Sequence, residues 1–203
     1  MHPSEAKKSM NLGDEKEYRG ISFQKQNMVR RDLRGRSFES CEFANCNCTE
    51  TDFRGSAFDT CTFVQCDLSL ANFKQAKLMG VEFRDCKLLG IPLLSCDQLA
   101  VSLQFERCVL QSCNFSEMGL KKTKFLDCTI KECDFIHADL RECDFHKSIF
   151  TDTHFNNCNM QNARFTECHG YSINPMNNNI KKTVFDLPDA VTLIEHLGAI
   201  IRP

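Results

Sequence analysis

Residues 66–80 read CDLSLANFKQAKLMG, and residues 133–147 read CDFIHADLRECDFHK. In both segments a large apolar residue returns every five positions, and a small residue precedes most of these by two positions. A period of five fits neither the 3.6-residue period of a helix nor the two-residue period of a continuous strand. It does fit a short strand segment with two inward side chains followed by a corner. The segments therefore predict a repeat of the form small, polar, large apolar, polar, turn.

Phenylalanine carries this repeat along most of the chain. Of the 17 Phe, eight lie at positions congruent to 3 modulo 5 from residue 23 to residue 83, and eight lie at multiples of 5 from residue 105 to residue 165. One phase change therefore relates two regular halves. Some of the nine glycines come two positions after a large apolar residue, where a corner can use their freedom in φ. These are Gly20, Gly35, Gly55, Gly80 and Gly90.

The 14 cysteines follow the same period, and only Cys48 falls outside it. Their C-x4-C spacing resembles that of zinc knuckles. The period, however, accounts for each pair without a metal, and no pairs of histidines match them. We expect reduced, buried thiols that pack as small apolar side chains, and we expect no metal and no cofactor.

The repeats closely resemble the pentapeptide-repeat family, whose consensus is A(D/N)LXX. The resemblance covers about residues 21–170. It implies an all-β fold, a right-handed quadrilateral parallel β-helix of about seven coils with four pentapeptides in each coil, followed here by a short C-terminal α-helix. A coil of about 20 residues would stack residue i on residue i+20.

That stacking can be tested within the sequence. A two-residue insertion between Phe83 and Phe105 completes one column of phenylalanines and one column of cysteines on the inside of the coil. We place the insertion in the irregular stretch 92–104, where Pro92 and Gln98 disturb the pattern. Stacked rings exclude water, so these columns form the predicted structural core. They consist of Phe23, Phe43, Phe63, Phe83, Phe105, Phe125, Phe145 and Phe165, with Cys46, Cys66, Cys86, Cys108 and Cys128.

The chain divides into three parts on this basis. Residues 1–17 lack the repeat and are expected to form a flexible N-terminal tail, residues 18–170 form the β-helix, and residues 171–203 form a C-terminal capping or dimerisation segment. A helix is predicted at about 188–198, with Asp186 as its N-cap and Pro188 in its first turn. Its apolar stripe could cover the open end of the β-helix or form a dimer interface, and the two roles are compatible. The stripe consists of Val191, Ile194, Leu197 and Ile201.

Composition and motifs narrow the class of function. The formal net charge of -2 lacks the basic excess of a protein that grips a phosphate backbone, so direct nucleic-acid binding is not expected. The longest nearly apolar stretch, 88–94, is far shorter than the roughly 20 residues of a membrane span. The first residues lack the apolar core of a signal peptide, so a cytoplasmic location is expected. No catalytic motif occurs, and the sequence is read as non-enzymatic.

Two groups of charged residues are candidate partner contacts. Residues 1–36 hold nine basic and five acidic side chains. Within them, Arg30, Arg31, Arg34 and Arg36 could be a solvated charged end of the coil or a patch for an acidic partner. Arg31 and Arg36 occupy slots that point inward in later coils, so the first coil could be frayed or open. The outward acids Asp134, Asp139 and Asp144 could cluster on one face of the rod and contact the partner there.

Within the family, the ending INPMNNNIKKTVFDLPDAVTLIEHLGAII resembles that of proteins that protect DNA gyrase and topoisomerase IV. These are the quinolone-resistance Qnr group, the mycobacterial fluoroquinolone-resistance protein and the microcin immunity proteins. The resemblance implies a C-terminally joined homodimer shaped like duplex DNA, which would bind a type II topoisomerase and protect it from quinolones or toxins. The alternative is an interaction scaffold or effector for another protein partner.

Overall fold

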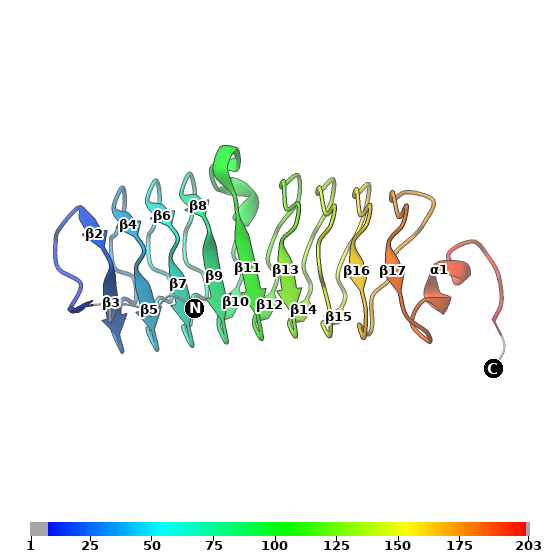
Figure 1. Cartoon of the computed structure of the whole chain (residues 1–203), viewed down its shortest axis with the longest axis horizontal. Helices are drawn as coiled ribbons and strands as arrows, with labels where there is room; N and C mark the ends of the chain where they lie inside the picture. Colours follow the sequence, from blue (N-terminus) through cyan, green and yellow to red (C-terminus); the bar gives the residue numbers. More distant parts are fainter. Residues whose placement is uncertain (1–7, 202–203) are drawn as a thin grey trace, which may run out of the picture.

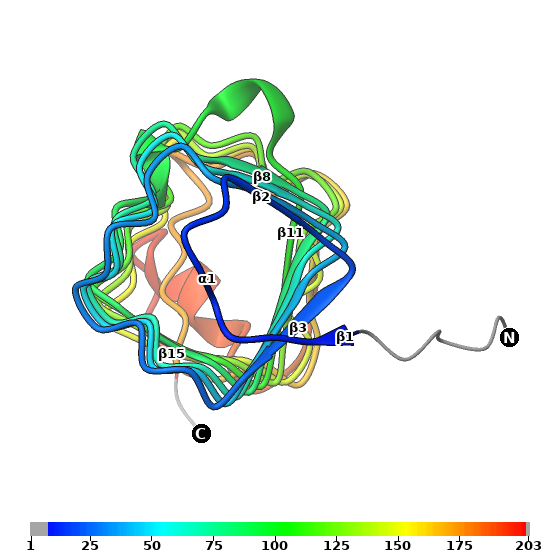
Figure 2. The same ribbon diagram turned by 90° about the vertical axis from the view of Figure 1, so that its left-hand side faces the viewer.

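The five-residue period builds a rod. In the computed structural model, which describes residues 8–201, the chain winds into a parallel β-solenoid of about eight turns with a short helix at its C-terminal end (Figure 1). The cross-section is four-sided when viewed along the rod (Figure 2), because each pentapeptide supplies one side and one corner. The turns exceed the expected seven because β2 (Glu17–Arg19) and β17 (Val184–Phe185) continue the register at the two ends. No helix within residues 8–201 is long and apolar enough to cross a membrane.

Four faces run along the rod, numbered here in chain order from residue 21. The first face holds β1 (Lys8–Ser9), β3 (Ile21–Gln24), β5 (Glu42–Ala44), β7 (Thr62–Val64), β9 (Val81–Arg84), β11 (Leu103–Glu106) and β13 (Lys124–Leu126), and then β16 (Arg164–Phe165) with β17. The second face holds β10 (Lys87–Leu89), β12 (Val109–Gln111), β14 (Thr129–Lys131) and β15 (Ile149–Thr151). The third face is joined by isolated bridges such as Asp32 with Asp52. The fourth face holds β2, β4 (Ser37–Glu39), β6 (Ala57–Asp59) and β8 (Lys77–Met79).

The predicted phenylalanine column is confirmed. On the first face Phe23 pairs in register with Phe43, and the pairing continues turn by turn to Phe125. Neighbouring rings stack with centroids 4.5–5.2 Å apart along the whole predicted column. Phe185, which the sequence analysis left out, extends the column by stacking on Phe165 at 5.3 Å. The column therefore runs nearly the full length of the solenoid.

The two-residue insertion lies within the predicted stretch 92–104. The backbone N–H of Asp97 still bonds to Ala76 O, whereas Ser102 N–H bonds to Leu78 O. The extra residues thus enter between Asp97 and Ser102, in a projecting loop formed by η1 (Leu93–Ser95) and η2 (Gln98–Ala100) (Figure 1). Beyond the loop Leu103 pairs with Val81 and the columns resume.

The corners use a left-handed backbone. Among residues 8–201, twenty-four non-glycine residues have φ between 47° and 66°, and the five glycines singled out in the sequence share this conformation. A residue with a Cβ adopts this conformation at a cost of roughly 1–2 kcal/mol. The ladder hydrogen bonds on both sides hold the corners there, as when Lys25 N–H donates to Ala44 O at 2.8 Å.

The small inward residue of many repeats also donates a hydrogen bond, a role that its size alone did not reveal. Cys61 Sγ lies 3.2 Å from Phe38 O of the preceding turn, and Cys66 Sγ lies 3.2 Å from Phe43 O. Ser56 Oγ makes the equivalent bond to Leu33 O at 2.7 Å. Cys, Ser and Thr share this position because each donates a hydrogen bond to a buried carbonyl that water cannot reach. All 14 cysteines are buried, including the predicted column from Cys46 to Cys128.

The N-terminal boundary drawn at residue 17 differs from the structure. β1 pairs with β3, Leu12 is buried, and the chain then crosses the open end of the first turn to reach β2 (Figure 2). Residues 8–17 therefore cover the end of the core. The part of the expected tail at residues 1–7 lies outside the described residues.

The C-terminal helix is shorter than expected. α1 spans Val191–Glu195, with Ala190 in the cap position and no side-chain cap. The carboxylate of Asp186, the expected cap, instead accepts a bond from Glu167 N–H at 2.9 Å. Asp186 thus ties the segment to the last turns of the solenoid, and the helix begins later. α1 lies beyond these turns, and Leu193 packs against the core (Figure 1).

Candidate interaction surfaces

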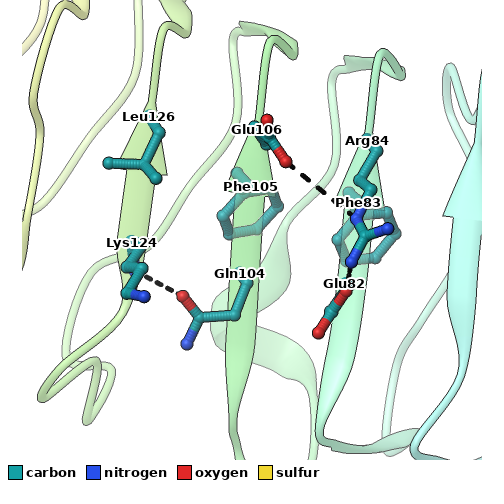
Figure 3. A pocket seen from close by; sticks show the side chains of 8 residues that line it. All are labelled: Glu82, Phe83, Arg84, Gln104, Phe105, Glu106, Lys124 and Leu126. Carbon is teal, nitrogen blue, oxygen red and sulfur yellow. Dashed lines mark hydrogen bonds and ion pairs between the residues drawn. The ribbon is translucent and has the colours of Figure 1, made fainter. Parts of the chain in front are cut away.

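One shallow hollow lies on the first face where β9, β11 and β13 run side by side (Figure 3). It measures about 370 Å³. Glu82, Arg84 and Glu106 line one part of it, and Arg84 pairs with both glutamates, with its Nε 4.0 Å from a Glu106 oxygen. Phe83 and Phe105 lie behind the backbone and are buried. Arg84 therefore compensates part of this acidic rim, and Lys124, which also lines the hollow, has no ion pair within residues 8–201.

Many of the outward-facing acidic side chains accept hydrogen bonds from the backbone and so stabilise the turns. Asp139 Oδ1 accepts the backbone N–H of Arg141 at 3.2 Å and its Nε at 2.8 Å, and Asp144 Oδ1 accepts His146 N–H at 3.1 Å. The same bond from the residue two positions later recurs along the rod. The acceptors are Asn27, Asp32, Asn47, Asp52, Asp67, Asn72, Asp97, Asn114, Asp139, Asp144, Asn159, Asn174 and Asn179. Asp or Asn is thus selected by the fold, whether or not a partner is present.

Many of these acids are also neutralised by arginines. Arg34 bonds to Asp32 at 2.6 Å and holds the pKa of that carboxyl at about 2. Hydrogen bonds from Arg141 likewise hold the pKa of Asp139 below its usual range. Asp134 differs, because His154 Nδ1 lies 2.9 Å from its carboxylate on the neighbouring turn. The three candidate acids therefore have different neighbours on the rod, and the negative charge of Asp139 is neutralised by Arg141.

The four candidate arginines separate into two pairs. Arg31 donates to the carbonyls of Leu12 and Gly13, and Arg36 donates to those of Gly13 and Glu15 and to Tyr18 Oη. These two side chains hold the N-terminal cap, so the first turn is closed and the expected fraying is absent from residues 8–36. Arg30 and Arg34 face solvent, where Arg30 pairs with Glu50 at 2.8 Å.

The repeat itself identifies the family. The family model of the pentapeptide repeat region matches residues 36–104 and 100–169. The chain belongs to the pentapeptide-repeat family. No curated protein sequence matches it significantly.

Among solved structures, the pentapeptide-repeat protein is similar to QnrB1, a plasmid-mediated fluoroquinolone resistance protein. A trypsin-treated variant of QnrB1 aligns with a TM-score of 0.69 and 17% identity over 96% of each chain. Full-length QnrB1 aligns with a TM-score of 0.57 and 19% identity over 90% of each chain. HetL from Nostoc, a pentapeptide-repeat protein involved in heterocyst differentiation regulation, has a TM-score of 0.37 and 13% identity, covering 83% of this chain and 84% of HetL. At such sequence identities the likeness to QnrB1 shows a shared fold and no more.

The apolar stripe of the C-terminal segment is partly exposed to solvent in the pentapeptide-repeat protein. Ile194, Leu197 and Ile201 are 46%, 58% and 43% exposed, whereas Val191 is half-buried. Leu193, which the sequence analysis did not single out, makes the contact with the core. The helix thus places different side chains toward the core and toward solvent.

Three of the buried thiols are held in their protonated form. Burial raises the pKa of Cys96 and Cys168 to about 12 and that of Cys158 to about 11, so these thiols stay protonated near neutral pH. Among the described residues, no group of three or more His, Cys, Asp or Glu side chains is arranged to hold a metal ion. The cysteines are placed as packing and hydrogen-bonding residues of the core.

Proposed function

We propose that this protein acts without catalysis, by binding a type II topoisomerase, DNA gyrase or topoisomerase IV, and protecting it from quinolones or peptide toxins in the cytoplasm. The observation that carries the proposal is the straight rod with flat faces. Eight turns about 4.8 Å apart make it roughly 38 Å long. Five residues per side at about 3.3 Å give each face a width of roughly 16 Å before side chains are added. A rod of this nearly DNA-like width would occupy a DNA-binding saddle and displace DNA from a drug-stabilised complex. QnrB1, a fluoroquinolone resistance protein, matches this rod over 96% of both chains.

A homodimer joined through Val191, Ile194, Leu197 and Ile201 would double the rod to roughly 75 Å. Support comes from the exposure of three of these side chains at the very end of the rod. Leu197→Asp should leave the solenoid folded, since Leu197 is 58% exposed, and should give a monomer in light scattering. A wild-type protein that is already monomeric at micromolar concentration would contradict the dimer.

The assay for topoisomerase protection is DNA supercoiling by purified gyrase with a quinolone at a half-inhibitory dose. Increasing amounts of the protein should restore supercoiling and, in large excess, inhibit it. The Leu197→Asp variant serves as the matched control, because a dimer-length rod is needed to fill a long saddle. No rescue, no inhibition and no detectable binding to gyrase would together rule the proposal out.

The second candidate, a scaffold or effector for another protein partner, is favoured by the charge balance. Duplex DNA carries one charge per about 1.7 Å. Here Asp32, Asp52 and Asp139 each pair with an arginine two positions later. Two results would favour the scaffold. One is binding to gyrase that is lost when DNA is removed, and the other is capture of a different stable partner by the rod.

A further inference from the structure

A strip of basic side chains follows the corner between the fourth and first faces in the C-terminal half. Lys124 and Arg164 begin β13 and β16 (Figure 1), and bridges from Lys124 to Asp144 and from Asp144 to Arg164 place them in one column. On the fourth face, bridges join residue 119 to 139, 139 to 159 and 159 to 179, so the residues two positions later also align. The strip consists of Lys121, Lys122, Lys124, Arg141, Arg164, Lys181 and Lys182.

The strip is positive on a chain whose net charge is -2. Its seven cations meet only three acids, Asp139, Glu142 and Asp144, which leaves a local charge of 7 minus 3, or +4. Glu142 pairs with Lys121 at 3.1 Å and with Lys122 at 3.6 Å. The side chains of Lys124, Arg164, Lys181 and Lys182 have no ion pair within residues 8–201. Elsewhere on the rod, solvent-exposed arginines such as Arg30 and Arg54 bind carboxylates.

Side-chain amides lie between these cations. Asn179 Nδ2 donates to Asn159 Oδ1 at 3.1 Å, and Gln161 and Asn162 lie beside this pair on the same turn as Asn159. The side-chain amides of Gln161 and Asn162 each offer donors and an acceptor, which match the C=O and N–H groups of an extended polypeptide. A phosphate backbone presents acceptors, so the amide acceptors would be left unused.

We propose that the basic strip binds an extended acidic segment of a protein partner. The distance from the turn of Lys121 to the turn of Lys181 is three steps of about 4.8 Å, or roughly 14 Å. An extended chain rises about 3.3 Å per residue, so about five residues span the strip, with alternate side chains facing it. Acidic residues at alternate positions would reach the unpaired cations while the main chain meets the amides. This surface is independent of the topoisomerase proposal, which rests on the shape of the whole rod.

The experiment uses a fluorescein-labelled ten-residue peptide of alternating Glu and Ser, with binding followed by anisotropy at 20 mM and 150 mM NaCl. Binding should weaken as salt rises, because exposed charges are screened. The triple variant Arg164→Ala, Lys181→Ala, Lys182→Ala should lose at least tenfold in affinity. The matched control, Lys25→Ala, Lys74→Ala, Lys77→Ala, removes three exposed lysines from the N-terminal half of the rod and should change affinity by less than twofold. Unchanged thermal unfolding in both variants shows that the solenoid is intact.

Three results would overturn the proposal. The first is the absence of peptide binding at 20 mM NaCl. The second is an equal loss of affinity in the strip variant and in the control, which would mean diffuse charge attraction. The third is tighter binding of a labelled DNA oligonucleotide than of the peptide, with the same dependence on the strip, which would mean a nucleic-acid surface.

Discussion

Replacing Phe125 tests the ring column most directly. Its ring is fully buried and stacks on Phe105 at 5.0 Å and on Phe145 at 4.9 Å. Phe115 and Phe135 contact its edge at 5.7 and 5.8 Å. Four rings therefore surround it, all held by the backbone ladder.

The magnitude follows from these contacts. Truncation of a buried Phe to Ala costs about 3–5 kcal/mol, and the upper part of that range applies where neighbours cannot collapse into the cavity. Phe125→Leu keeps an apolar side chain and loses two stacked pairs. Each pair contributes about 0.5–1.5 kcal/mol, so this change should cost about 1–3 kcal/mol. The order of stability should be wild type, then Leu, then Ala.

Urea unfolding followed by far-UV circular dichroism gives the free energy of unfolding. The two tyrosines, Tyr18 and Tyr171, are buried near opposite ends of the core, so their fluorescence shows whether both ends unfold in the same transition. Lys124→Ala, on the same strand but exposed, is the control and should change stability by less than about 0.5 kcal/mol. If Phe125→Ala destabilises the protein no more than this control does, the ring column does not hold the rod together.

Three further outcomes are expected. Gly170→Ala should destabilise strongly, because φ is +74° and the new Cβ would lie 2.3 Å from Phe150 O, whereas Gly55→Ala, at φ +67° in open space, should cost only about 1–2 kcal/mol in thermal or urea unfolding. Thiol titration should find few reactive cysteines before unfolding and 14 after it, and substantial reactivity in the native protein would contradict their burial. Hydrogen bonds from Arg34 depress the pKa of Asp32 to about 2, so its stabilising contribution is complete above about pH 4 and is lost as the pH falls toward 2. Asp32→Asn should reduce this part of the acid dependence of the melting temperature, and an unchanged profile would exclude Asp32 as its source.

The inside of the rod could be predicted from the sequence because one physical requirement repeats in every turn. Phe43 must stack between Phe23 and Phe63, so the spacing alone reveals the column. The same logic located the insertion in the stretch 92–104, and the backbone hydrogen bonds of Asp97 and Ser102 then narrowed it. The donor role of Cys61 was missed, although the shared slot of Cys, Ser and Thr was a usable signal, since all three can donate a hydrogen bond.

The ends could not be predicted in this way. Residues 8–17 carry no repeat, and their placement depends on Arg31 and Arg36 reaching back to the carbonyls of Leu12 and Gly13. Helix rules favoured Asp186 as a cap, but Glu167 N–H binds its carboxylate. In both cases a tertiary contact overrides a local pattern.

The outer surface of the rod could be predicted from the sequence only in part. Asp139 was expected at the surface and lies there, but its bonds to Arg141 show that the fold itself requires it. Charges such as Lys121 and Lys181 come to lie on one strip only through the register, which the sequence does contain. Reading outward positions in steps of one turn, as was done for the core, would have revealed the basic strip.

The cap over the first turn has a consequence for synthesis on the ribosome. Nearly every ladder bond joins residues about one turn apart, so each turn can close against the one before it without waiting for distant parts of the chain. Residues 8–17 and Arg36 emerge early and seal the starting end of the core. The growing chain can therefore add finished turns in order, with only its newest edge exposed to unwanted pairing.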